Sequence, residues 1–200
     1  MRRRTLLLSL VLSLSTVLLP ARAAESGPED LVRRITGEVL EAVKTDPQLA
    51  AGDRKKALAL AEQKILPHVD FREATQLAVG KAWQSATPPQ QERLVAEFRA
   101  MLVRIYSNAV EVYRGQTMKV MPLRMAANDT EVTVRNQYLR DGQPPVRVDY
   151  AMRKTAQGWK IYDITVEGVS LVLTYRAEFE SVVRNDGVDG LIRRLQQKNA

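Results

Sequence analysis

YDITVEGVSLVLTYRAEFE, residues 162–180, marks the point at which the chain changes from a strand to a helix. Its first part alternates apolar and polar side chains, which is typical of a half-buried strand, and a glycine and a serine then interrupt the alternation. From Leu171 onward the apolar residues recur at helical spacing, at Tyr175 and Phe179. The turn LVLTY is apolar on nearly every side, so we expect it to lie beside another apolar surface.

The segments before this stretch show the same alternation. They read QTMKVMPLR (116–124), TEVTVRNQYLR (130–140), PVRVDYAMRK (145–154) and GWKIYDITVEG (158–168). The links between them, ANDT, DGQPP and AQG, are rich in turn-forming residues. This pattern predicts antiparallel strands that each bury one face.

Helical periodicity dominates the first half of the chain and the end. The shorter predicted helices lie in SGPEDLVRRITGEVLEAVKTD, GDRKKALALAEQKIL, DFREATQLAVG and VDGLIRRLQQK. The clearest helix covers residues 88–114. Thr87 is its expected N-cap, Pro88 takes its first position, and Gln90 completes a capping box.

Helices followed by strands and then by helices predict an α+β fold. We expect a curved antiparallel sheet of about four strands, covered on one face by the helix at 88–114 and by the helix after Ser170. Such a sheet and its helices would enclose a cone-shaped space. Side chains that fill this space make a core, and an unfilled space makes an apolar pocket.

The first 23 residues have the pattern of a cleaved secretory signal peptide. MRRR precedes a short apolar run, and the small-residue site Ala21-Arg22-Ala23 follows. We expect residues 24–200 to form a single domain. Without residues 1–23, which hold four arginines and no acid, 26 basic residues face 23 acidic ones, so the net charge falls from +7 to +3. This small positive net charge does not indicate binding to nucleic acid. The absence of cysteine excludes disulfides and thiolate metal sites.

Three polar residues are candidates for chemistry. His68, the only histidine, is interpreted as a loop residue, because nothing near it except Asp70 could complete a catalytic set. Asp163 is either the base of an enzyme with a cone-shaped pocket or, more simply, a carboxylate that satisfies backbone or arginine partners. Arg176 could hold a phosphate at a pocket mouth or form an ion pair with Asp163.

Several motifs resemble those of the MlaC family, the periplasmic phospholipid carriers of the Mla lipid-transport system, also called toluene-tolerance proteins. The similarity runs from about Pro28 to Leu195. Its strongest part is WKIYDITVEGVSLVLTYRAEF, with further matches in HVDFREATQLAVGKAW and in the segment that begins TPPQQERL. The matching positions are Trp159, Tyr162, Asp163, Glu167, Gly168, Ser170, Tyr175, Arg176 and Phe179, and, earlier in the chain, Asp70, Phe71, Gly80, Trp83 and Gln91.

The resemblance implies a pocket that holds both acyl chains of a phospholipid and leaves the headgroup outside. It also implies a periplasmic location, exchange of lipid with an outer-membrane complex of MlaA and a porin, and exchange with MlaD of an inner-membrane ABC transporter. Such a carrier maintains outer-membrane lipid asymmetry, needs no catalytic residue or cofactor, and is expected to be a monomer. An enzyme with a cone-shaped pocket and an envelope scaffold without lipid are the alternatives.

Apolar residues that point inward are the candidate lipid-binding residues, and the side of each strand is assigned from its alternation. The assigned residues are Leu102, Ile105, Tyr106 and Ala109 on the long helix, Val132, Val134, Val146, Val148 and Tyr150 on the strands, and Ile164, Val166, Leu171 and Val172 in and after the last strand.

Overall fold

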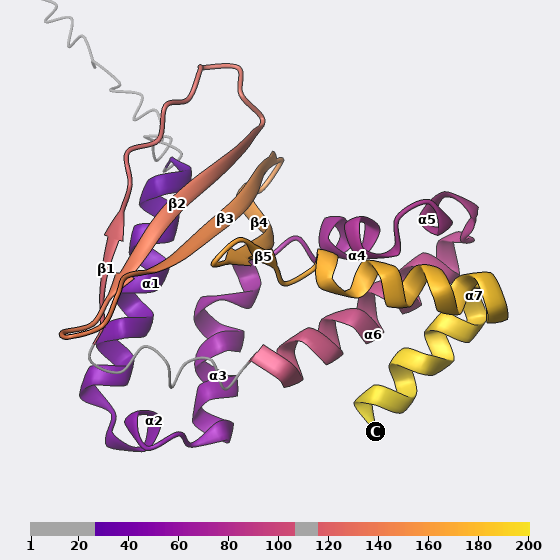
Figure 1. Ribbon diagram of the computed structural model, residues 1–200, viewed down its shortest axis with the longest axis horizontal. Coiled ribbons are helices and arrows are strands. Elements are labelled where there is room, and N and C mark those ends of the chain that lie inside the picture. Colours follow the sequence, from indigo (N-terminus) through magenta and orange to yellow (C-terminus); the bar gives the residue numbers. More distant parts are fainter. Residues whose placement is uncertain (1–26, 107–115) are drawn as a thin grey trace, which may run out of the picture.

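The computed structural model describes residues 27–106 and 116–200 and has the predicted α+β architecture (Figure 1). The predicted signal peptide and Ala109 lie outside the described residues. The sheet is antiparallel with its strands in chain order, and it has five strands where about four were expected. The strands are β1 (Thr117–Val120), β2 (Glu131–Leu139), β3 (Val146–Thr155), β4 (Gly158–Val166) and the two-residue β5 (Val169–Ser170).

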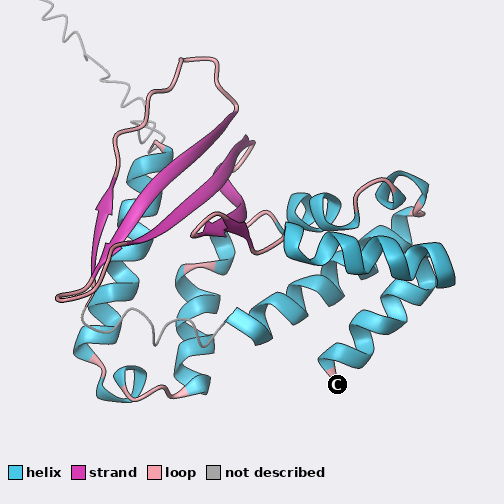
Figure 2. Ribbon diagram, viewed as in Figure 1, coloured by secondary structure: helices cyan, strands magenta, loops and turns pink. Residues whose placement is uncertain are grey.

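Helices precede and follow the sheet, as Figure 2 shows in cyan. They are α1 (Pro28–Thr45), α2 (Pro47–Ala50), α3 (Arg54–Lys64), α4 (Phe71–Val79), α5 (Ala82–Ser85), α6 (Pro88–Tyr106) and α7 (Arg176–Asn199), with short 3₁₀ turns η1 (Leu66–His68) and η3 (Leu173–Tyr175).

Side-chain oxygens cap the starts of several helices. The Asp53 carboxylate accepts a hydrogen bond from the Lys56 amide, and Asp70 caps α4 in the same way. At α6 the backbone amide of Thr87 donates to Gln90 Oε1 at 2.9 Å, and the Gln90 amide donates back to Thr87 Oγ1 at 3.4 Å. This reciprocal pair is the capping box that the sequence predicts.

The buried apolar residues form two main clusters. The sheet cluster joins α1 to strands β1–β4 and comprises Leu31, Val32, Ile35, Val120, Val134, Tyr138, Val148, Tyr150, Met152, Trp159 and Ile161. The helical cluster joins α4, α5, α6 and α7 and comprises Ala74, Ala78, Val79, Trp83, Ala86, Leu94, Phe98, Met101, Val172, Phe179, Leu191, Ile192 and Leu195.

The helix that packs closely on β1 and β2 is α1, whereas we expected α6 and α7 to cover the sheet. Within the described residues α6 packs mainly on α7 and α4. The cause lies in the apolar stripe of α6, because Phe98 makes edge-to-face contacts with Phe179 and Tyr175, at ring-centroid distances of 5.3 and 5.5 Å. The helices α4–α7 therefore form a lobe beside the sheet (Figure 1).

α7 bends sharply at Gly187, which has φ 69° and ψ −176°. This backbone conformation is available essentially only to glycine. At the same bend Gly190 approaches Asp186 so closely that a Cβ atom on Gly190 would lie 2.2 Å from the Asp186 Cβ. The two glycines allow the last turns of the chain to fold back and add Leu191 and Leu195 to the helical cluster.

Candidate functional site

One face of the sheet gathers the apolar strand residues, and we call it the inner face. Val134 of β2 lies opposite Tyr150 of β3, and Tyr150 lies opposite Ile164 of β4. Val148 likewise lies opposite Val166. Since directly paired residues share a face, the predicted strand positions lie together on the face that α1 covers in part.

A β-bulge in β4 brings both halves of that strand onto the inner face. Ala151 and Met152 are consecutive in β3, but their partners, Asp163 and Ile161, are two residues apart. Tyr162 is therefore the extra residue. It reverses the alternation of inward and outward side chains. Ile161 before the bulge therefore belongs to the sheet cluster, and Ile164 after the bulge packs against the same cluster.

The inner face is closed at one end and open at the other. Along β3, Met152, Tyr150 and Val148 are 0, 7 and 8% exposed, whereas Val146 is 37% exposed. Val169, which pairs with Val166 beside Val148, is 58% exposed. We call the region around Val146, Val166 and Val169 the open corner. Large apolar side chains that remain exposed on a shared face indicate a surface that another apolar group covers.

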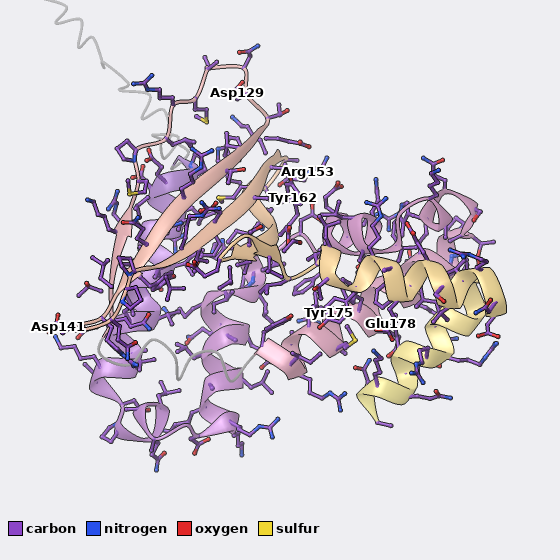
Figure 3. All side chains as sticks on the ribbon, in the orientation of Figure 1. Asp129, Asp141, Arg153, Tyr162, Tyr175 and Glu178 are labelled. Atoms are coloured by element: carbon purple, nitrogen blue, oxygen red, sulfur yellow. The ribbon has the colours of Figure 1, made fainter. Side chains whose placement is uncertain are left out.

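The last turns of α6 also expose apolar side chains. Burial along the stripe falls from Phe98, which is fully buried, through the half-buried Leu102 to Ile105, which is 45% exposed. The hydroxyl oxygens of Tyr106 and Tyr175 lie 3.5 Å apart, which joins the end of α6 to η3. Tyr175 is labelled in Figure 3. Burial, with a smaller contribution from the Tyr106 hydroxyl, raises the pKa of Tyr175, so the Tyr175 hydroxyl keeps its proton.

The remaining candidates lie between β5 and α7. Leu171 is half-buried, whereas Val172 is 5% exposed and belongs to the helical cluster. Leu173, which was not among the candidates, is 41% exposed. The apolar turn LVLTY therefore contacts the helical cluster through Val172 and Tyr175 and leaves Leu173 uncovered.

Asp163 has a structural arrangement of hydrogen bonds. Its side chain is buried and accepts hydrogen bonds from Ser170 Oγ at 2.6 Å, from the Ile164 amide at 2.8 Å and from the Val172 amide at 3.2 Å. These bonds connect β4 to β5 and to the residue before η3. The carboxylate thus fixes the chain at the open corner, where a catalytic base would instead need a free lone pair directed at a substrate.

The other two polar candidates also have structural surroundings. The Arg176 guanidinium pairs with Glu180 at 3.2 Å, and not with Asp163 as one prediction had it. It also lies against Gly80, where a Cβ atom would be 3.0 Å from Arg176 Nη2. At His68, burial, with smaller effects of nearby Arg34 and Lys160, lowers the pKa of the imidazole.

Three surface hollows lie away from the inner face's open corner. One of about 470 Å³ beside β2 includes Val132 in its lining. One of about 520 Å³ lies in the bend of α7, and one of about 530 Å³ lies between α3 and α6. Within residues 27–106 and 116–200, no cluster of three acidic or histidine side chains is arranged to hold a metal ion, and no helix is long and apolar enough to cross a membrane.

Sequence reasoning missed several residues of this region. Val169 and Leu173 are exposed at or beside the open corner, yet their exposure depends on where β5 and η3 end. Asn136 is fully buried on the inner face, where its Nδ2 donates to the Val134 carbonyl at 3.1 Å and its Oδ1 has no partner among the described residues. The alternation of β2 does place Asn136 on the same face as Val134, so this position could have been found.

An apolar sheet face that is only partly covered, with large apolar side chains exposed at its open corner, indicates a protein that binds apolar molecules. A sequence model of the MlaC protein family matches residues 33–197. The chain therefore belongs to the MlaC family, a family of lipid-binding carriers and not of enzymes.

Individual relatives agree with this assignment. The MlaC binding protein of the intermembrane phospholipid transport system of Haemophilus influenzae is 21% identical and covers 87% of this chain and 83% of its own length. The toluene tolerance protein ttg2D of Pseudomonas putida is 24% identical, and the match covers 94% of this chain and 85% of that protein. A phospholipid-binding protein of Ralstonia solanacearum, solved in complex with a phospholipid, is 38% identical and superposes with a TM-score of 0.78. The match covers 87% of this chain and 97% of that protein.

Proposed function

We propose that this chain is a periplasmic phospholipid carrier that holds both acyl chains against the inner face and leaves the headgroup at the open corner. The observation that carries this proposal is the solved relative with bound phospholipid, which is 38% identical over 87% of this chain. The exposed apolar residues Val146, Val169, Leu173 and Ile105 support it, because bound acyl chains would cover them.

The energetics of acyl-chain burial explain why such a carrier is needed. Two acyl chains contain on the order of 30 methylenes, and transfer of each from water to an apolar site is worth about 0.8 kcal/mol, which gives roughly 24 kcal/mol in total. A bilayer offers nearly the same gain, so exchange between membrane and carrier is close to balanced. Partner proteins that shift the free energy of the carrier-bound lipid slightly relative to that of the membrane-bound lipid then set the direction of transfer.

The proposal includes the partners that the family resemblance implies. These are an outer-membrane complex of MlaA with a porin on one side and MlaD of an inner-membrane ABC transporter on the other. Transfer between them would maintain the lipid asymmetry of the outer membrane. The carrier would act as a monomer after removal of its first 23 residues, since an open corner has to face one membrane complex at a time.

Lipid extraction from the purified protein tests the central claim. We expect phospholipid to be co-purified and detected by native mass spectrometry, and we expect added phospholipid to raise the melting temperature, because a ligand that binds only the folded state stabilises it. A protein that contains no lipid as purified, takes up none on reloading and melts at an unchanged temperature is a scaffold and not a carrier.

Overfilling the inner face tests where the lipid lies. Val148→Trp should reduce lipid occupancy in a folded protein, because the added ring occupies space on the inner face. Arg147→Trp is the matched control, since the neighbouring side chain is exposed on the opposite face. If Val148→Trp fails to fold, Leu171→Trp at a half-buried position makes the same test. Full occupancy in a folded inner-face variant would refute the proposed location.

A further inference from the structure

The hollow between α3 and α6, which we call the α3–α6 groove, has an apolar floor. Ala96, Ala100 and Val103 recur along one face of α6, and Leu58 and Leu66 face them from α3 and η1. The two alanines are exposed and the three larger side chains are half-buried. This face of α6 differs from the stripe that enters the helical cluster, so the groove is a second apolar surface, separate from the inner face.

Basic residues flank this floor on both sides. Arg54 and Lys55 lie in the first turn of α3, Arg99 and Arg104 lie on α6, and Glu62 is the acidic residue among those that line the groove. Within the described residues, Arg54, Lys55 and Arg104 make no ion pair. The Arg99 guanidinium lies 5.4 Å from the centre of the Phe71 ring, which holds it at the rim. Four cations against one carboxylate make the groove strongly positive.

The shape of the groove favours a rod over a flat surface. α3 alone extends from Arg54 to Lys64, which at 1.5 Å per residue is about 15 Å, or nearly three helical turns. The apolar floor lies in a hollow lined by α3 on one side and by α6 on the other, so a planar bilayer would meet the cations before it met the floor. The chain's own N-terminal 23 residues are a poor occupant, because they carry four arginines and no acid.

We propose that the α3–α6 groove is a docking site for an amphipathic helix of a partner protein, with an apolar stripe and acidic residues along its flanks. Its apolar side chains would cover the alanines and Val103, and its carboxylates would pair with the cations on both rims. Helix-in-groove recognition uses this combination of apolar anchors and flanking charges. The proposal goes beyond lipid carriage, since it assigns a protein-binding role to a surface that does not include the open corner.

Site-specific photo-crosslinking in the cells that produce the full-length chain tests this site. A photo-reactive residue replaces Ala100 on the groove floor, and crosslinked peptides are identified by mass spectrometry. We expect them to come from a protein segment that has acidic residues and apolar residues at helical spacing. Crosslinks to lipid, crosslinks to neutral or basic segments, or no crosslinks at all would each overturn the proposal.

Charge reversal supplies the matched comparison. Arg54→Glu together with Arg104→Glu should lower the crosslink yield about tenfold or more, because like charges would then face each other across the interface. Lys44→Glu together with Arg184→Glu makes the same change in net charge at exposed positions outside the groove and should leave the yield unchanged. Equal yields from the two double variants would refute the role of the rim.

Lipid content measured in the same variants separates this proposal from the proposed carrier function. We expect both double variants to retain as much phospholipid as the unmodified protein. Loss of lipid only in the Arg54→Glu and Arg104→Glu variant would mean that the groove is part of the lipid site and would contradict a separate partner surface. A wild-type protein without lipid that still crosslinks to an acidic helix would refute the carrier function alone.

Discussion

Replacement of Asp163 by asparagine should destabilise the protein without making it an inactive enzyme. The carboxylate is 7% exposed and accepts three hydrogen bonds, from Ser170 Oγ and from two backbone amides. A hydrogen bond to a charged group contributes about 1.5–3 kcal/mol, against about 0.5–1.5 kcal/mol for a neutral one. An asparagine keeps the amide bonds as neutral ones and turns an NH₂ group toward Ser170.

The size of the effect follows from this exchange. A loss of about 1 kcal/mol at each of two or three bonds gives about 2–3 kcal/mol for Asp163→Asn. In a domain of this size each kcal/mol corresponds to about 2–4 °C, so the melting temperature should fall by at least about 4 °C. Asp163→Ala should cost more, about 4 kcal/mol, because it leaves the Ser170 hydroxyl and the Val172 amide without their acceptor.

Urea denaturation of the variants checks these values. Asp141→Asn, in the exposed turn between β2 and β3 (Figure 3), is the matched control and should stay within about 0.5 kcal/mol of the wild type. Because Asp163 fixes the chain at the open corner, its loss should also speed the release of bound phospholipid. Asp163→Asn with wild-type stability and wild-type lipid retention would refute the structural role that we assign to this carboxylate.

Three further predictions concern other parts of the fold. Gly190→Ala should lower the free energy of unfolding by more than about 2 kcal/mol in chemical denaturation, because the new Cβ would lie 2.2 Å from the Asp186 Cβ. Gly37→Ala is the control: a Cβ there has no neighbour within 4 Å, so this change should stabilise the protein by about 0.5–1 kcal/mol. Equal effects of the two changes would contradict the observed bend. His68→Asn should reduce the loss of stability on acidification. The pKa of His68 in the folded protein lies below its ordinary value, so the unfolded chain binds the proton more readily and wild-type stability falls as the pH drops below about 6.5. Identical pH–stability curves for the variant and the wild type would argue against this role of His68. Thr87→Ala should lower the melting temperature through a loss of about 1 kcal/mol at the α6 N-cap, and an unchanged value would show that the capping box is dispensable.

Much of the local structure could be predicted from residue patterns. The cap at Thr87 was found because a side-chain oxygen before a helix satisfies nearby backbone amides, which is a local interaction. The strands from β1 to β4 were found because alternation reports burial of one face. The family motifs around Asp163 and Arg176 were equally readable, although the partners of these two residues were not.

The candidate lipid-binding residues were only partly predictable. Alternation placed Val148 and Tyr150 on one face, but it could not show that burial decreases toward Val146, because that depends on how far α1 extends over the sheet. The stripe on α6 likewise continued without a break through Ile105. Only the packing of α7 and α4 shows that the helical cluster ends before this residue.

Residue patterns alone gave the order and type of the longer elements, the α6 cap and the membership of the MlaC family, because these depend on interactions between residues close together in the chain or on motifs of residue identity. The tertiary structure decided which helix covers the sheet, where the β4 bulge reverses the alternation, and which corner of the inner face stays open. These features depend on contacts between distant segments such as α1 with β2 and Asp163 with Ser170. Each such contact is selected by competition among many apolar surfaces of similar burial energy, and periodicity alone does not rank them.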